Sequence, residues 1–261
     1  MADAGVASRT VWVDGRAVAV WERGEGPTVV LLHAAWGSGE HWQPQLEPLA
    51  EAGFHALAWS RRGHLGSDPG PAEETGTFVD DLAALLDALG LDRVHLVGTA
   101  FGGFGAAAIA LLLPHRLLSL TLAASICGIA DPDFRAETDA LVPAEIEALP
   151  PQLRELSAAY RYADPAGAAR WAALTQRAVP TRVHQPVGAE VTRTGLGAIR
   201  VPTRFIAGEA DLYMPPARMA RLAEHLPGSR LGVVPAAGHS PSWENPAAFN
   251  DLLLEHLVSA R

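Results

Sequence analysis

The sequence contains no lysine, so all 20 of its basic residues are arginine. Lysine forms Schiff bases and binds phosphates in P-loops, and its absence excludes both kinds of site. Cys127 is the only cysteine, which excludes an intramolecular disulfide and a cysteine-rich metal cluster. The ten histidines form neither a His-x-His pair nor a His-Glu-x-x-His motif. We therefore expect no metal and no other cofactor.

Positive charge and long apolar runs are also scarce. The net charge of −9 offers no basic face for a phosphate backbone, so we expect no nucleic-acid partner. No run approaches the roughly 18 apolar residues that a membrane span needs, and the first ten residues lack the basic-then-apolar order of a signal peptide. The expected protein is cytoplasmic, a monomer or homodimer, with a small-molecule substrate and no membrane partner.

Short β-rich runs alternate with Ala- and Leu-rich helical stretches. This order predicts one α/β domain over residues 1–261, with a mostly parallel eight-stranded sheet and helices on both faces. Asp14 and Gly15 form a turn pair between the first two runs, so we expect the sheet to begin with an antiparallel hairpin. The predicted strands lie at 10–15, 17–22, 28–34, 55–60, 93–99, 118–124, 203–209 and 230–235.

A long segment between the sixth and seventh predicted strands has no strand pattern of its own. It carries several prolines and helical patches such as GAARWAALTQRA. We expect a helical lid over about residues 130–200, covering the carboxyl ends of the strands, where open α/β sheets bind ligands. The alternative is a helical segment that packs against the domain and does not control access to the site.

The strand at 93–99 runs into Gly98–Gly103 (GTAFGG) and then into an apolar helix. A strand, a tight turn between small residues and a helix form the geometry of a nucleophile elbow. The start of the helix offers free N–H groups and a positive dipole end, which suit a developing oxyanion. A dinucleotide-binding turn would need Gly-x-Gly-x-x-Gly after the first strand, whereas this run follows the fifth or sixth.

On this motif the chain resembles the α/β-hydrolase family, and the resemblance covers nearly all of its length. The central residue of Gly-x-Ser-x-Gly is the nucleophile in that family, and here the position holds Ala100. A methyl group cannot act as a nucleophile. The expected fold is therefore that of a hydrolase, with its catalytic hydroxyl missing.

The resemblance also implies the positions of the acid and the base. Asp211 follows the strand at 203–209 and matches the acid, while His239 follows the strand at 230–235 and matches the base. The carboxylate would orient the imidazole, and the imidazole would move the proton. Asp131 is an alternative acid, because some members of the family use that position.

The run His33-Ala34-Ala35-Trp36-Gly37 resembles the His-Gly-x-x loop that supplies half of the oxyanion hole. By position, the backbone N–H groups of Ala35 and Phe101 would be the donors, and His33 would be structural. Ala34 replaces the usual glycine, which narrows the backbone conformations open to this loop.

A further segment, SRRGHLGSD at 60–68, resembles a loop that supports the active-site face in the family, so Arg61, Arg62 and His64 are expected to be structural. Aromatic and small residues near the expected site are candidates for the pocket wall. These candidates are Trp36, Thr99, Cys127, Tyr160, Trp171 and Trp243.

Ala100 leaves three interpretations open. In the first, the protein is a hydrolase of a small, fairly apolar ester, thioester, lactone or ketone, present here with its nucleophile serine replaced by Ala100. In the second, the alanine is native, and the His239–Asp211 pair serves as a general base in a lyase, decarboxylase or isomerase. In the third, the chain is a non-enzymatic binding protein for a small ligand.

Overall fold

The computed structural model describes residues 6 and 8–260; the start of the chain, where no signal peptide was expected, lies largely outside the described residues. One sheet of eight strands runs in the order β1-β2-β4-β3-β5-β6-β7-β8. Neighbouring strands are parallel from β4 onward, which confirms the predicted, mostly parallel sheet. The strands are β1 (Arg9–Val13), β2 (Arg16–Arg23), β3 (Thr28–Leu32), β4 (His55–Trp59), β5 (Val94–Thr99), β6 (Leu117–Ala123), β7 (Thr203–Gly208) and β8 (Arg230–Val234).

The sheet begins with the expected hairpin. β1 pairs antiparallel with β2, and Val13 lies opposite Arg16 across a two-residue turn. Asp14 and Gly15 have φ angles of 48° and 76°, the left-handed pair that a tight hairpin turn requires. β2 also pairs antiparallel with β4, so the antiparallel hairpin is joined to one edge of the parallel sheet.

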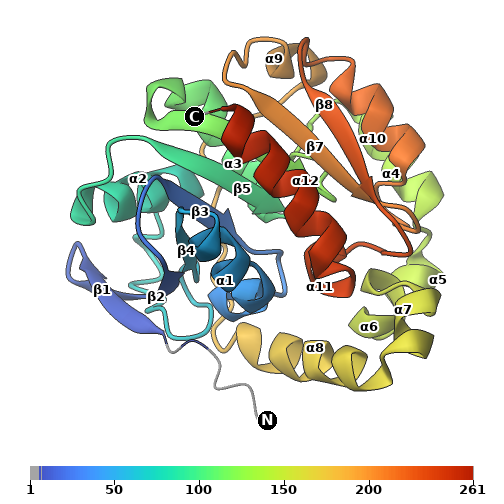
Figure 1. Ribbon diagram of the computed structural model, residues 1–261, viewed down its shortest axis with the longest axis horizontal. Coiled ribbons are helices and arrows are strands. Elements are labelled where there is room, and N and C mark those ends of the chain that lie inside the picture. Colours follow the sequence, from blue (N-terminus) through green and yellow to red (C-terminus); the bar gives the residue numbers. More distant parts are fainter. Residues whose placement is uncertain (1–5, 7, 261) are drawn as a thin grey trace.

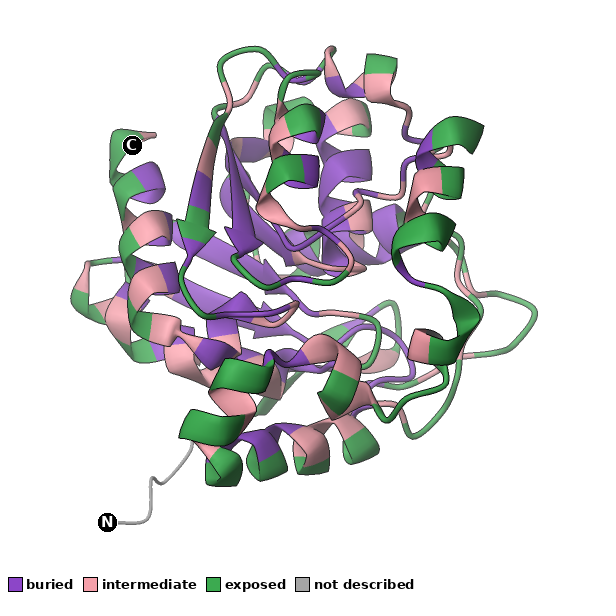
Figure 2. Ribbon diagram, turned by 90° about the vertical axis from the view of Figure 1, so that its right-hand side faces the viewer, coloured by how far each residue is buried: buried purple, intermediate pink, exposed green. Residues whose placement is uncertain are grey.

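Helices cover both faces of the sheet (Figure 1). α2 (Phe78–Ala88), α3 (Gly102–Leu112) and α10 (Pro216–Ala223) pack in one hydrophobic core, while α1 (Gln43–Glu51) and α12 (Pro246–Ser259) pack in another. All five residues of β3 are buried, as expected for a strand with helices on both sides. Figure 2 shows the buried strands inside and the exposed faces of the helices outside.

The segment between β6 and β7 is helical in the structure. A parallel bridge between Ile129 and Val191 joins its two ends. Proline stands at the first turn of three of its helices, where the missing N–H costs no hydrogen bond. The helices are α4 (Pro132–Leu141), α5 (Ala144–Glu147), α6 (Pro151–Glu155), α7 (Ala158–Ala163), α8 (Pro165–Ala178) and α9 (Arg193–Leu196).

Short helical turns complete the fold: η1 (Gly39–Trp42), η2 (Pro114–Arg116) and α11 (Pro241–Glu244). Across the part of the chain that the structure describes, no helix has the length and apolar character to span a membrane. The carboxyl ends of β3, β5, β7 and β8 lead into the loops that carry the predicted site residues.

Close backbone packing at the end of β5 leads to a test of the fold. A Cβ on Gly102 would lie 2.2 Å from the carbonyl oxygen of Leu32, which belongs to the neighbouring strand. We expect Gly102→Ala to lower the free energy of unfolding by about 3 kcal/mol, because neither backbone segment can retreat from the clash.

Gly228→Ala is the matched control, since that glycine has a φ of +85° but faces open space. Its expected cost is about 1 kcal/mol, from the left-handed backbone alone. Urea unfolding of the two variants measures both values, and equal losses would contradict the packing argument.

Candidate active site

Ala100 occupies a tight turn between β5 and α3. Its φ of 47° lies in the left-handed region, which a non-glycine residue adopts at a cost of about 1–3 kcal/mol. The Ala100 N–H donates to the Ala123 carbonyl at 3.0 Å, and the Ala100 carbonyl accepts from Gly103 N at 3.0 Å and from Ser125 Oγ at 2.6 Å. The turn therefore has the backbone of a nucleophile elbow, with a methyl group as its side chain.

His239 and Asp211 meet as the sequence predicted. His239 Nδ1 lies 2.9 Å from both carboxylate oxygens of Asp211, so the imidazole donates Nδ1–H and is left with Nε2 for the cavity. The Asp211 side chain is fully buried, and its Oδ1 accepts from the N–H groups of Tyr213 and Met214 at 2.8 and 3.0 Å. The Tyr213 ring packs against the imidazole at 4.5 Å. The carboxylate is thus held in one orientation toward the base.

Two further carboxyl groups act on His239. Burial alone lowers the pKa of His239, but attraction to Asp211, the hydrogen bond with it and the charges of Glu155 and Glu244 raise that pKa to about 9. Burial raises the pKa of both Glu155 and Glu244. The resting imidazole is consequently protonated at neutral pH.

Glu244 links the base loop to the β6–β7 insertion. Its Oε1 accepts from the N–H groups of Gly238 and Ser240 at 2.9 and 3.1 Å, and its Oε2 accepts from Ser157 N at 2.7 Å. The His239 N–H donates to the Glu155 carbonyl at 2.8 Å. The insertion therefore contributes directly to the surroundings of the imidazole.

The loop after β3 is held in a single backbone arrangement. The Ala34 carbonyl accepts from His33 Nδ1 at 2.7 Å and from Gly37 N at 3.0 Å. Because a trans peptide places its C=O and N–H on opposite sides, these two bonds also orient the N–H of Ala35. Neither this N–H nor that of Phe101 has a hydrogen-bond acceptor within residues 8–260 as described. Both amides are available to an oxygen atom of a ligand.

Two buried histidines hold this loop in place through hydrogen bonds. His33 Nε2 accepts from Arg61 N at 3.1 Å, so its Nδ1 must carry the proton given to Ala34. His64 Nδ1 donates to the Gly37 carbonyl at 2.7 Å, and the two rings lie 4.5 Å apart. Burial lowers the pKa of His33 well below its usual range and that of His64 to about 3, so both are neutral. The structure places His33 and His64 in supporting positions.

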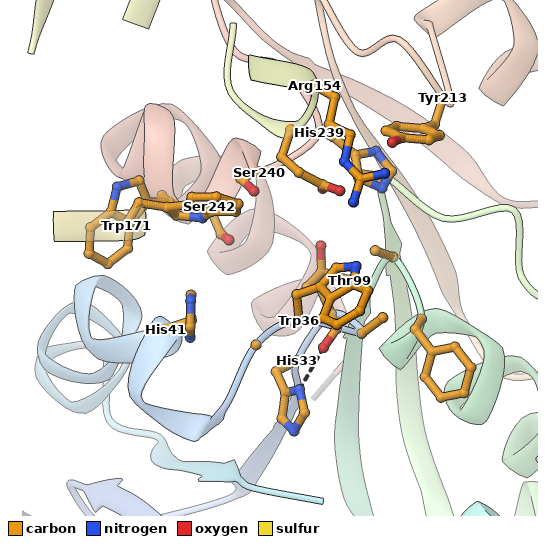
Figure 3. A pocket seen from close by; sticks show the side chains of 18 of the residues that line it. His33, Trp36, His41, Thr99, Arg154, Trp171, Tyr213, His239, Ser240 and Ser242 are labelled. Carbon is orange, nitrogen blue, oxygen red and sulfur yellow. Dashed lines mark hydrogen bonds between the residues drawn. The ribbon is translucent and has the colours of Figure 1, made fainter. Parts of the chain in front are cut away.

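A cavity of about 280 Å³ lies between the turn at Ala100, the loop after β3 and the insertion. Figure 3 shows His239, Arg154 and Tyr213 at one end and His41 and Trp171 at the other. Most of its wall is apolar. The predicted site residues on this wall are Ala35, Trp36, Thr99, Ala100, Phe101, Trp171, His239 and Trp243, while Asp211 lies directly behind His239.

Three expected residues lie elsewhere. Cys127 is fully buried in the core rather than on the cavity wall, and burial raises the pKa of its thiol to about 12. Tyr160 packs in a small cluster with Trp171 and Trp243, and its hydroxyl lies toward Asp164 rather than the cavity. Asp131 pairs with Arg193 at 3.4 Å, so it is not the acid beside His239.

The sequence reasoning missed several residues on the cavity wall. Arg154 and Glu155 come from α6, a short helix whose sequence carries no motif. His41 comes from η1; its Nδ1 accepts from Ser38 N at 3.1 Å, and burial lowers its pKa to about 4. Tyr213, Ser240 and Ser242 on the wall stand within three residues of the expected acid or base, and Glu244, behind the wall, lies five residues after the base.

Comparisons with known proteins give a family and several relatives. A family model described as the alpha/beta hydrolase family matches residues 29–252. RutD of Caulobacter sp. (strain K31), named for a carbamate hydrolase activity, is 32% identical over 88% of this chain and 90% of its own length.

Two solved structures are also similar. Est816, described as an N-acyl homoserine lactone degrading enzyme, is 30% identical with a TM-score of 0.74, covering 94% of this chain and 98% of that one. A thermophilic esterase from Thermogutta terrifontis superposes with a TM-score of 0.80 at 23% identity, covering 97% and 99% of the two chains. The second likeness concerns the fold alone.

The raised pKa of His239 can be tested directly. Asp211→Asn removes the charge that raises it while burial remains, so we expect the pKa of His239 to fall from about 9 to below the ordinary value of 6.5. An NMR titration of the imidazole signals, with His239→Gln to assign them, measures the shift. A pKa that stays near 9 in Asp211→Asn would show that Glu155 and Glu244 dominate.

The neutral buried pair His33 and His64 predicts acid sensitivity. Both have a lower pKa in the folded chain than in the unfolded chain, so below about pH 6.5 the unfolded state binds more protons. Stability should fall as the pH drops from 6.5 toward 3. Urea titrations of the parent and of His64→Gln check this, and the variant should lose less stability over that interval than the parent does.

Proposed function

We propose a substrate class for this chain, which belongs to the alpha/beta hydrolase family. Its site binds the carbonyl group of a small, fairly apolar ester, thioester, lactone or ketone. The site has every part needed for acyl transfer except one hydroxyl, whose position is taken by Ala100. As it stands, the chain binds such a substrate without forming an acyl-enzyme. The Ala100→Ser form is the hydrolase.

The strained turn at Ala100 carries this proposal. A left-handed backbone costs energy and serves to lift one side chain toward a substrate. The same turn leaves the Phe101 N–H without an acceptor among the described residues; the Ala35 N–H likewise has none, and both residues line the cavity. A chain with no use for a nucleophile at this point would gain stability by relaxing the turn.

The chemistry follows from the atoms in place. A hydroxyl at position 100 would attack the carbonyl carbon and pass its proton to Nε2 of His239, whose charge Asp211 stabilises. The N–H groups of Ala35 and Phe101 would bind the oxyanion. The imidazolium then protonates the leaving group, and water repeats the sequence on the acyl-enzyme. Because only the neutral imidazole accepts a proton, the rate should rise as the pH approaches 9.

The cavity and the relatives support the substrate class. Trp36, Phe104, Trp171 and Trp243 give the wall its apolar character. Its volume of about 280 Å³ suits a small acyl chain rather than a polymer. A lactone is the substrate named for Est816. Two other relatives are named as hydrolases, one of 2-hydroxy-6-oxononadienedioate and 2-hydroxy-6-oxononatrienedioate and the other of 2-hydroxy-6-oxo-6-phenylhexa-2,4-dienoate.

A second candidate is base-catalysed chemistry by the chain as it stands. The carboxyl groups of Asp211, Glu155 and Glu244 make His239 a stronger base than an ordinary imidazole. Such a base beside two free N–H donors could remove a proton next to a carbonyl group, with the enolate held by those donors. This reaction would require no residue that forms a covalent bond.

Restoring the hydroxyl tests both candidates. Loss of the nucleophile costs roughly a millionfold in a serine protease, so Ala100→Ser should raise p-nitrophenyl butyrate hydrolysis by at least about a thousandfold. A fluorophosphonate should label the serine form and leave the parent unlabelled. Intact-protein mass spectrometry and steady-state kinetics measure the two effects.

Ala100→Ser/His239→Ala is the control, because it has the hydroxyl and lacks the base; its activity should return to the parent level. An inert, unlabelled Ala100→Ser form with correct folding would refute the hydrolase proposal. Proton exchange next to the carbonyl of a bound ketone by the parent, lost in His239→Ala, would then support the second candidate.

A further inference from the structure

Two adjacent buried arginines differ in their partners. Arg62 forms a bidentate ion pair with Asp81, with Nε–Oδ2 and Nη2–Oδ1 distances of 3.0 and 2.7 Å. Arg61 is only 7% exposed, yet no carboxylate pairs with it and its Nε has no hydrogen-bond partner within the described part of the chain. A buried cation without an anion is costly, so its position calls for an explanation.

The guanidinium of Arg61 lies on aromatic rings instead. Its Cζ is 4.5 Å from the centroid of the Phe101 ring and 5.5 Å from that of Phe78. Cation–π contacts offset part of the cost of burial. Burial still lowers the pKa of Arg61 to about 9, which leaves it charged at neutral pH. The positive charge therefore rests against the residue that offers one of the two free amides.

The backbone of the same residue reaches the other free amide. Arg61 N donates to His33 Nε2 at 3.1 Å, and His33 Nδ1 donates to the Ala34 carbonyl at 2.7 Å. That carbonyl shares its peptide plane with the N–H of Ala35. The side chain of Arg61 thus contacts Phe101 directly. Its backbone is linked to the Ala35 peptide through two successive hydrogen bonds.

We propose that Arg61 is a positioning residue for the oxyanion hole, which aligns both N–H donors and adds a positive charge to that of His239. The inference rests on the proposed function, because it assumes that Ala35 and Phe101 receive the oxyanion. A preorganised charge in a water-poor site favours the anionic state over the neutral one without moving. Arg61, which has no carboxylate partner in the described part of the chain, then gains a counter-charge when the anion forms.

A pair of ligands that differ only in charge tests this on the chain as it stands. Hexanoate and hexanamide have the same length, and both place an oxygen at the free amides. We expect the parent to bind hexanoate, Arg61→Met to weaken that binding by at least about tenfold, and hexanamide affinity to change less than about twofold. Methionine keeps the apolar contact with the rings and removes the charge. Isothermal titration calorimetry measures the four affinities.

Arg61→Lys is the second variant, because it retains a cation; it should bind hexanoate more tightly than Arg61→Met does. If Arg61→Met weakens the binding of hexanoate and of hexanamide equally, Arg61 has only a packing role and the proposal is overturned. No loss for hexanoate, or no binding of hexanoate by the parent, would overturn it as well. Melting temperatures of both variants report whether the fold survives.

Catalysis supplies an independent readout. In the Ala100→Ser background, Arg61→Met should lower kcat by about 10- to 100-fold with KM unchanged, because the charge acts on the oxyanion and not on the neutral substrate. If Ala100→Ser is inert while Arg61 still controls hexanoate binding, the hydrolase proposal fails and this one stands. If Ala100→Ser is active and Arg61→Met alters neither kcat nor hexanoate affinity, the hydrolase proposal stands and the proposal for Arg61 fails.

Discussion

The left-handed turn at Ala100 is the constraint on which the rest of the site depends. It is held by the bond from Ser125 Oγ, by two backbone bonds and by the close approach of Gly102 to the end of β3. This packing brings the start of α3 against the loop after β3 and leaves the N–H of Phe101 unused. This contact between α3 and the loop after β3 therefore sets where the cavity and the two free amides lie relative to the imidazole of His239.

Charge is distributed unevenly around the cavity. On one side, the buried carboxyl groups of Asp211 and Glu244 and the half-buried one of Glu155 surround His239 and keep its imidazole protonated at neutral pH. On the other side, His33 and His64 are neutral, and Arg61 is a cation without a carboxylate partner in the described structure. An anion at the free amides would thus lie between two positive groups. This arrangement suits a site in which negative charge develops on a carbonyl oxygen.

The β6–β7 insertion contributes residues and hydrogen bonds to the site. Glu244 joins the base loop to Ser157, and Arg218 donates to the Tyr213 carbonyl and to Phe134 and Thr138 of α4. The insertion is therefore bonded to both loops that carry the His239–Asp211 pair. Any movement of these helices would alter the surroundings of the base.

The sequence by itself determined the sheet, the elbow at Gly98–Gly103 and the pairing of Asp211 with His239, because strand patterns, small residues in tight turns and loop positions after parallel strands are local signals. It also located Ala100. The tertiary structure alone decided that Glu155 and Glu244 raise the pKa of the base and that Cys127 and Tyr160 lie off the cavity wall. It also decided that Arg61, unlike Arg62, has no carboxylate partner among the described residues. Each of these depends on how segments distant in the chain pack together, and burial, not sequence spacing, sets the energy of a charge.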